Sequence, residues 1–246
     1  MNSAQIFRAF GPVDARMVWR DSLLRSSLFL PVVMGLAMRV VVPPVIAAVS
    51  RLINFDMQPY APMTLTYLML MMMPSFAGML VGMLLLDQRD DRTLTALQVT
   101  PLSLKGYLIY RLAVPTLLGF VMTLIAVPLS GLMTFSIGAL LAAALLSAPL
   151  APVFALVFAG LAANKVQGLA VMKTVGGIVE LPIIGFFLPE QWQPLFGVIP
   201  TYWPAKVFTL LQNGEPGAWL YALVGVAYQL LLIWLLAQRF HHQMTH

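Results

Sequence analysis

Residues 64–86 read TLTYLMLMMMPSFAGMLVGMLLL, a run of 23 residues without a single charged side chain. A helix needs roughly 20 predominantly apolar residues to cross the hydrocarbon core of a bilayer. Backbone polar groups in lipid must be satisfied inside the segment, and a helix does this. We therefore predict a transmembrane helix over this stretch.

Five further stretches meet the same criterion of length and apolarity. One precedes residues 64–86 and four follow them. With residues 64–86 they make six predicted spans: 27–49, 64–86, 107–130, 136–161, 168–188 and 217–237. The sequence predicts an all-α polytopic membrane protein. Residues 1–246 are expected to form a single transmembrane domain, with the six-helix bundle over 27–237.

The composition supports lipid as the solvent for most of the chain. Hydrophobic residues make up 60% of the sequence and charged residues 9%, with a mean hydropathy of +0.88. Soluble domains carry roughly 25% charged residues. A soluble fold of this length could not bury so much apolar surface in one core.

The basic residues are distributed unevenly between the two sides of the predicted bundle. With a cytoplasmic N-terminus, the outside holds Arg51 and Lys206. The inside then holds eleven: Arg8, Arg16, Arg20, Arg25, Arg89, Arg92, Lys105, Arg111, Lys165, Lys173 and Arg239. Cytoplasmic loops carry the excess of Lys and Arg. Both termini are therefore expected in the cytoplasm. The membrane is expected to be a bacterial plasma or inner membrane. We assign the net charge of +5 to topology and to contact with anionic lipid, not to binding of nucleic acid.

Residues 1–26 have the pattern of an amphipathic helix. Phe7, Phe10, Val13 and Met17 lie roughly on one side, while the arginines fall elsewhere. An apolar face bordered by basic residues suits a helix that lies in the inner membrane interface. The alternative is a cytoplasmic extension of the first span.

Two connections are long enough to have structure of their own. Residues 87–106 form a polar cytoplasmic segment, in which Leu94 and Leu97 share one helical face before Pro101 interrupts the helix. Such a short helix suits docking into a groove on a cytoplasmic partner, and the alternative is a solvated loop. Residues 189–216 form an external loop rich in Trp and Pro, which we expect to lie on or dip into the outer leaflet.

The cytoplasmic segment resembles that of the permease subunits of type-2 ABC exporters. The matching pattern is two acidic or basic pairs, Thr-Leu, a spacer, Leu, Thr-Pro-Leu-Ser and the start of a helix that contains an aromatic residue, with Arg92 where the family commonly has Gly. The six spans, the amphipathic N-terminus and the external loop extend the likeness along the chain, and the small drug-export permeases, including the fluoroquinolone exporters, are the most similar group. The residues that carry the match, together with those beside them, are Arg89, Asp90, Asp91, Arg92, Thr93, Leu94, Leu97, Thr100 and Pro101.

This resemblance implies a division of labour between chains. The permease would pair with a second copy or a related permease, and each would bind a separate ATP-hydrolysing subunit. The family's coupling helix would fall on about residues 89–100, and its interfacial helix on about residues 4–25. ATP and Mg²⁺ would belong to the partner subunit, because this chain has no phosphate-binding loop and hence no cofactor of its own.

Arg39 lies inside the first predicted span. A charge at mid-bilayer is costly, and such residues usually face a cavity or a partner. If Pro43 and Pro44 end the helix early, Arg39 instead lies near the outer interface, where its side chain can reach water. Both interpretations stay open, and Arg39 is a candidate for the substrate pathway.

Glu180 is a second candidate for the substrate pathway. Lys173 precedes it by seven residues, so both lie on one helical face about 10 Å apart along the axis. Glu180 is thus free to meet a cationic substrate, a proton or a polar group of another span, and the alternative role is a structural hydrogen bond. Pro182, with Gly176 and Gly177, predicts a kink nearby.

The methionines of residues 64–86 allow two interpretations. Methionine is flexible and polarizable and suits surfaces that accept varied apolar ligands. Met72 is therefore a third candidate for the substrate pathway. The alternative is ordinary packing or lipid contact, because four of the six methionines (Met69, Met71, Met72, Met73, Met79 and Met83) crowd all sides of the helix.

Catalytic motifs are missing from the sequence. There is no cysteine, no His-Glu-x-x-His zinc motif and no Gly-x-Ser-x-Gly nucleophile elbow. We expect a transport subunit that exports a hydrophobic or amphipathic compound with no catalytic and no metal-binding residues. The alternatives are an ion-driven carrier, a membrane-embedded enzyme or a scaffold.

Overall fold

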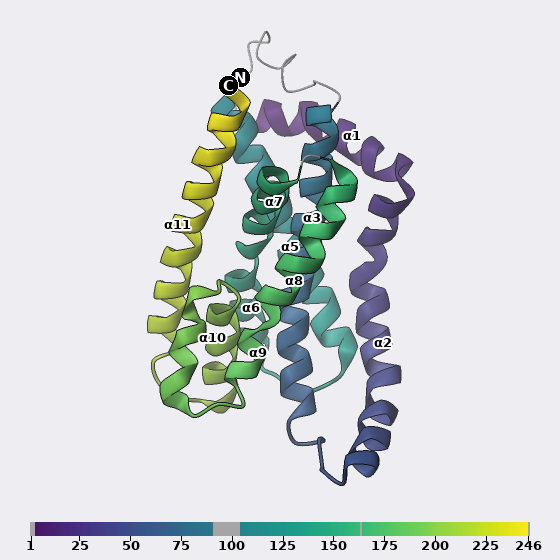
Figure 1. Cartoon of the computed structure of the whole chain (residues 1–246), viewed down its shortest axis with the longest axis vertical. Coiled ribbons are helices and arrows are strands. Elements are labelled where there is room, and N and C mark those ends of the chain that lie inside the picture. The colour runs from purple at the N-terminus through teal and green to yellow at the C-terminus, as the bar shows by residue number, and fades with distance from the viewer. Residues whose placement is uncertain (1–2, 91–103, 163, 246) are drawn as a thin grey trace.

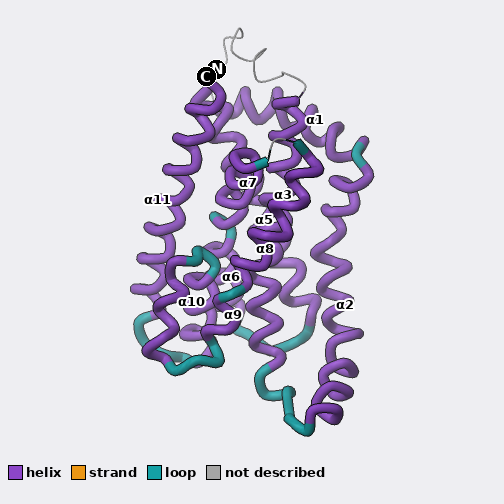
Figure 2. Tube along the Cα trace, viewed as in Figure 1, coloured by secondary structure: helices purple, strands orange, loops and turns teal. Residues whose placement is uncertain are grey.

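The computed structural model describes residues 3–90, 104–162 and 164–245, and the statements below concern these residues. All the regular secondary structure there is helical (Figure 2). Six of the described segments are long and apolar enough to cross a membrane: Leu24–Ile53, Ala61–Gln88, Gly106–Ser130, Ile137–Leu161, Val166–Gly185 and Ala218–Phe240. Each overlaps a predicted span, so the all-α architecture with six spans is confirmed.

Helix α3 (Ala61–Asp90) lies at the centre of the bundle (Figure 1). In its most apolar stretch 78% of the residues are buried, against 6% for the span of α2 (Ser22–Ile53) and 17% for that of α11 (Ala218–Thr245). Helix α3 packs mainly on α5 (Leu104–Ser130) and α7 (Leu150–Leu161). Most of its methionines are therefore core residues, as the packing interpretation predicted: Met69, Met71, Met73, Met79 and Met83.

Helix α1 (Ser3–Arg20) is separate from the first span and lies across the end of the bundle where both termini meet (Figure 1). The chain turns at Asp21, whose carboxylate accepts a hydrogen bond from the amide of Leu24 at 3.2 Å in the first turn of α2. The Phe10 ring packs on the rings of Tyr107 and Tyr110, each at 5.7 Å between centroids. The interpretation of residues 1–26 as an extension of the first span is therefore wrong.

Proline breaks two of the spans. The fourth span consists of α6 (Ile137–Ser147) and α7, and the chain between them contains Pro149, which lacks an amide donor. The fifth span consists of α8 (Lys165–Glu180) and the short α9 (Pro182–Gly185), so the kink predicted near Pro182 is present as a break. Pro43 and Pro44, by contrast, do not end α2, which continues to Ile53.

The segment predicted as the external loop is mostly helical. It contains a 3₁₀ helix, η1 (Glu190–Val198), and α10 (Tyr202–Asn213), which folds back against α6 and α11. Polar contacts hold it: the Thr201 hydroxyl donates to the Val179 carbonyl at 2.6 Å. The Tyr67 hydroxyl is hydrogen-bonded to that of Thr209, which ties α10 to the central helix.

Two glycines one turn apart let α3 and α7 approach closely. A β-carbon on Gly78 would lie 2.3 Å from the carbonyl oxygen of Ala151 and 2.6 Å from the β-carbon of Phe154. A β-carbon on Gly82 would lie 2.8 Å from that of Phe158. Small residues at such spacing are the usual means by which helices pack tightly in lipid.

We predict that Gly78→Ala lowers the free energy of unfolding by about 1–3 kcal/mol, because the methyl group must displace the α7 backbone. Thermal unfolding of the purified protein in detergent measures this. Gly160→Ala is the matched control, since no atom lies within 4 Å of its added β-carbon. Equal free energies of unfolding for the two variants would show that the close approach of α3 and α7 does not contribute to stability.

Candidate functional site

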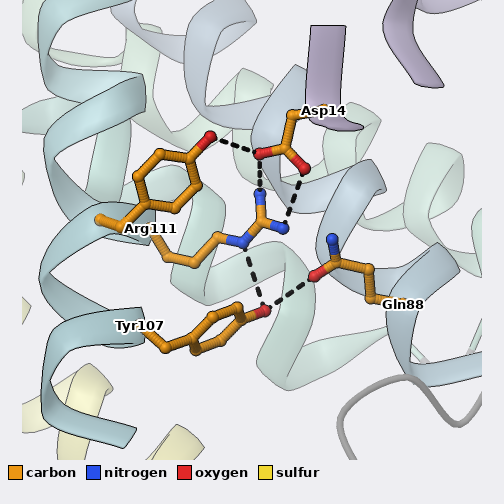
Figure 3. Close-up of polar contacts among 5 residues, drawn as sticks. Asp14, Gln88, Tyr107 and Arg111 are labelled. Carbon is orange, nitrogen blue, oxygen red and sulfur yellow. Dashed lines mark hydrogen bonds and ion pairs between the residues drawn. The ribbon is translucent and has the colours of Figure 1, made fainter. Parts of the chain in front are cut away.

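A buried ion pair joins α1 to α5 at the end of the bundle where the termini lie (Figure 3). Arg111 is 1% exposed and Asp14 is 6% exposed. The Arg111 guanidinium donates from Nη1 to Asp14 Oδ2 at 2.7 Å and from Nη2 to Oδ1 at 3.2 Å. This two-bond geometry is the strongest arrangement available to an arginine and a carboxylate.

Two tyrosines of α5 and a glutamine of α3 complete the network. The Tyr110 hydroxyl donates to Asp14 Oδ2 at 2.8 Å. The Tyr107 hydroxyl accepts a bond from Arg111 Nε at 3.2 Å and donates to Gln88 Oε1 at 2.8 Å (Figure 3). The guanidinium carbon also lies 5.3 and 5.4 Å from the centroids of the two tyrosine rings, within the range of cation–π attraction.

The network fastens three helices at one level. Asp14 comes from α1, Gln88 from the last turns of α3, and Arg111 from the start of α5. Helices α3 and α5 are also the two that residues 91–103 connect. The polar network therefore fixes the end of α3 and the start of α5 relative to each other, and residues 91–103 join these two helices.

Sequence reasoning missed this network. Arg111 counted only as one of the cations that set topology, and Asp14 was not singled out. The local signals were an acidic residue within a basic amphipathic helix, and Tyr107 placed one turn before Arg111. Neither signal shows that Asp14 and Arg111 meet, because they are 97 residues apart in the chain.

A cavity of about 380 Å³ lies between α3, α7 and α8. This volume is within the range of about 300–1,000 Å³ that is typical of pockets for drug-sized ligands. Its lining is mostly apolar and comprises Met71, Met72, Ser75, Phe76, Phe154, Phe158, Lys173, Val175, Gly176, Gly177, Val179 and Glu180. The structure thus brings together Met72 and Glu180, two of the three residues predicted for the substrate pathway.

Glu180 is half-buried at this cavity, and Lys173 lies on the same helix. Among the described residues, neither side chain has a hydrogen-bond or ion-pair partner. The structural hydrogen bond considered for Glu180 is therefore not formed within the described part of the chain. Gly176 and Gly177, between the two charges, leave open space: an added β-carbon would meet no atom within 4 Å.

Arg39, the third predicted pathway residue, lies elsewhere. It lines a separate hollow of about 280 Å³ with Gln58 and Ser130. Its side chain approaches Gly131, in the turn between α5 and α6. Arg39 is therefore not part of the cavity that contains Glu180. Helix α2 continues past Arg39 to Ile53, so Pro43 and Pro44 do not end the helix there.

The residues predicted to contact a partner fall largely outside the described part. Arg89 and Asp90 are the last residues of α3, and nothing is described of their side chains. The others lie in residues 91–103, which are not described: Asp91, Arg92, Thr93, Leu94, Leu97, Thr100 and Pro101. Their role stays a prediction.

Six candidate spans, three of which contribute residues to a drug-sized apolar cavity, define the class: a multi-pass membrane protein. Comparison with known proteins gives the family. The family model described as "Fluoroquinolones export permease protein Rv2686c-like" matches residues 14–237, and the chain belongs to this family. The resemblance to drug-export permeases expected from residues 89–101 is confirmed.

Two curated relatives come from Mycobacterium tuberculosis. They are "Fluoroquinolones export permease protein Rv2686c" of strain H37Rv and "Fluoroquinolones export permease protein MT2760" of strain CDC 1551. Each is 33% identical to this chain over 234 residues, which cover 94% of this chain and 92% of the relative. No solved structure matches the chain.

We predict that Asp14→Ala and Arg111→Met each lower the free energy of unfolding by about 3–5 kcal/mol, because each leaves one buried charge without its partner. The double variant should lose less than the sum of the two losses, since it removes both charges. Denaturant unfolding in detergent measures this cycle. Arg16→Met, an exposed charge of the same helix α1, is the control and should change stability by about 0.5 kcal/mol or less. Strictly additive losses would show that the two charges act independently.

Proposed function

We propose that this chain is the membrane-spanning subunit of an ATP-driven exporter whose substrates are amphipathic aromatic drugs, fluoroquinolones among them. A separate subunit binds ATP and Mg²⁺ and hydrolyses the nucleotide. The active assembly contains two permeases, identical or related, and two ATP-binding subunits.

The cavity between α3, α7 and α8 is the observation that carries this proposal. It has the volume of a drug-sized ligand and an apolar, aromatic wall, and it lies among helices of the predicted spans. The names of the two mycobacterial relatives, which describe export of fluoroquinolones, support the substrate class. Met72 and Glu180 are the proposed contact residues in this cavity.

The excess of basic residues supports a cytoplasmic location for both termini. Figure 1 shows the two ends of the described chain at one end of the bundle, as an even number of spans requires. In this orientation the network around Asp14 and Arg111 faces the cytoplasm. The connection between α3 and α5 then faces the ATP-binding subunit.

Residues 89–101 are the proposed contact with that subunit. Leu94 and Leu97 would fill a groove on the partner, and the charges of Arg89, Asp90, Asp91 and Arg92 would fix the register. When ATP closes the two partner subunits, this contact moves the ends of α3 and α5. Because Asp14 and Arg111 join α1 to α5, and Tyr107 joins α5 to Gln88, the three helices move as a unit and the cavity changes its access from inside to outside.

We predict that Leu94→Asp, or reversal of the charges of Arg89 and Arg92, abolishes the stimulation of the partner's ATPase by the permease. The changed surface no longer fits the groove, whereas the membrane part is untouched. The measurement is the ATPase rate of the co-purified complex in lipid nanodiscs, together with the yield of the complex.

Arg51→Glu is the matched control, because it reverses a charge in the last turn of α2, on the connection between α2 and α3 and not on that between α3 and α5. It should leave both the ATPase rate and the yield unchanged. Normal stimulation and normal complex formation in the Leu94 and Arg89/Arg92 variants would remove the proposed contact.

A further inference from the structure

We infer that the cavity selects flat aromatic molecules that carry both a positive and a negative group, with Glu180 binding the cation and Lys173 the anion. The inference rests on the proposed function, which it deepens by assigning one residue of the cavity to each charged group of the substrate. The two residues, Lys173 and Glu180 of α8, have side chains that form no hydrogen bond or ion pair within the described part of the chain.

The body of the cavity fits an aromatic ring system. Phe76 of α3 and Phe154 and Phe158 of α7 contribute three rings to its wall. Aromatic side chains bind flat rings by stacked and edge-to-face contacts. The adjacent methionines supply flexible, polarizable surface that tolerates variation among such ligands.

The two charges lie at the distance that one extended ligand can bridge. Seven residues of an α-helix rise by about 10 Å and return to nearly the same face. Lys173 and Glu180 therefore lie on one side of α8, and both line the cavity. That separation is too large for a direct ion pair, and none forms.

The cost of these charges argues for a ligand. An ionisable group in a membrane-spanning segment is expensive unless it is paired or faces a polar partner. The buried charge of Arg111 is paired with Asp14, whereas the half-buried Glu180 and the exposed Lys173 have no hydrogen-bond or ion-pair partner among the described residues. A zwitterion laid along α8 pairs both at once and leaves no net charge in the cavity.

Gly176 and Gly177 leave room for such a ligand. They occupy the stretch of α8 between the two charges, and an added β-carbon at either would meet only open space. The body of the ligand can therefore lie directly against the helix backbone while its two ends reach Lys173 and Glu180.

The experiment uses three forms of one drug. Norfloxacin carries a carboxylate and a piperazine ammonium, its ethyl ester keeps only the ammonium, and N-acetylnorfloxacin keeps only the carboxylate. The dissociation constant of each is measured from the drug's fluorescence with the full-length permease in lipid nanodiscs. The variants are Glu180→Gln and Lys173→Gln, and Glu190→Gln and Arg51→Gln serve as controls outside the cavity.

The expected pattern is specific to the charge that each probe retains. Glu180→Gln weakens binding of norfloxacin and its ester by about 10- to 100-fold, the effect of losing a hydrogen bond to a charged group, and leaves N-acetylnorfloxacin unchanged. Lys173→Gln weakens norfloxacin and N-acetylnorfloxacin and leaves the ester unchanged. Glu180→Asp and Lys173→Arg, which keep the charges, should restore most of the affinity and show that the Gln variants are folded.

Equal weakening of all three probes by either variant, no weakening at all, or no binding of any probe to the unchanged protein would each overturn the inference. The proposed function is tested separately, by ATP-dependent transport of norfloxacin with the partner subunit present. If norfloxacin is transported but the two Gln variants do not show these probe-specific losses of affinity, the inference is refuted and the proposed function stands. Absence of transport refutes the proposed function, whatever the binding result.

Discussion

The ion pair between Asp14 and Arg111 is the contact on which the end of the bundle that holds both termini depends. Both groups are withdrawn from water, so each relies on the other for the interactions that water would have provided. The Tyr110 hydroxyl adds a further hydrogen bond to Asp14, and the Tyr107 hydroxyl accepts one from Arg111, so each charge is paired and hydrogen-bonded. Since the pair joins α1 to α5, it also decides where the N-terminal helix lies against the bundle.

Arg111 and the pair Glu180 and Lys173 show two contrasting arrangements of charge within the spans. At Arg111 the charge is bound by Asp14 and Tyr107 and fixes helices in place. At Glu180 and Lys173 the charges face a cavity and have no partner among the described residues. The cost is largest for the half-buried Glu180, and its lack of a partner at the cavity is why we assign that partner to the ligand.

The sequence predicted the six spans because each is a long apolar run, a signal that one segment carries by itself. The break at Pro149 and the folding back of α10 were not predicted, because both depend on how neighbouring helices pack. For the same reason the sequence could not pair Asp14 with Arg111.

The candidate site was predicted in part. Met72 and Glu180 were chosen on separate grounds, from composition and from charge, and the fold brings them to one cavity from α3 and α8. Arg39 was chosen on the same charge argument, but it lies at the turn between α5 and α6, because α2 packs along α5. Lys173 was noted as a cation of the inner side and as a neighbour of Glu180, not as a candidate for the substrate pathway. The cavity connects it to the aromatic residues of α3 and α7, a relation that three-dimensional packing alone creates.

The source of energy is the central claim, and drug accumulation in inside-out membrane vesicles tests it most directly. The vesicles contain the permease with its ATP-binding subunit, and an ionophore collapses the proton gradient. The account predicts that added ATP still drives norfloxacin into the vesicles and that a non-hydrolysable ATP analogue does not. Accumulation that needs no nucleotide, and that occurs only when the ionophore is left out, would contradict this prediction and identify an ion-driven carrier.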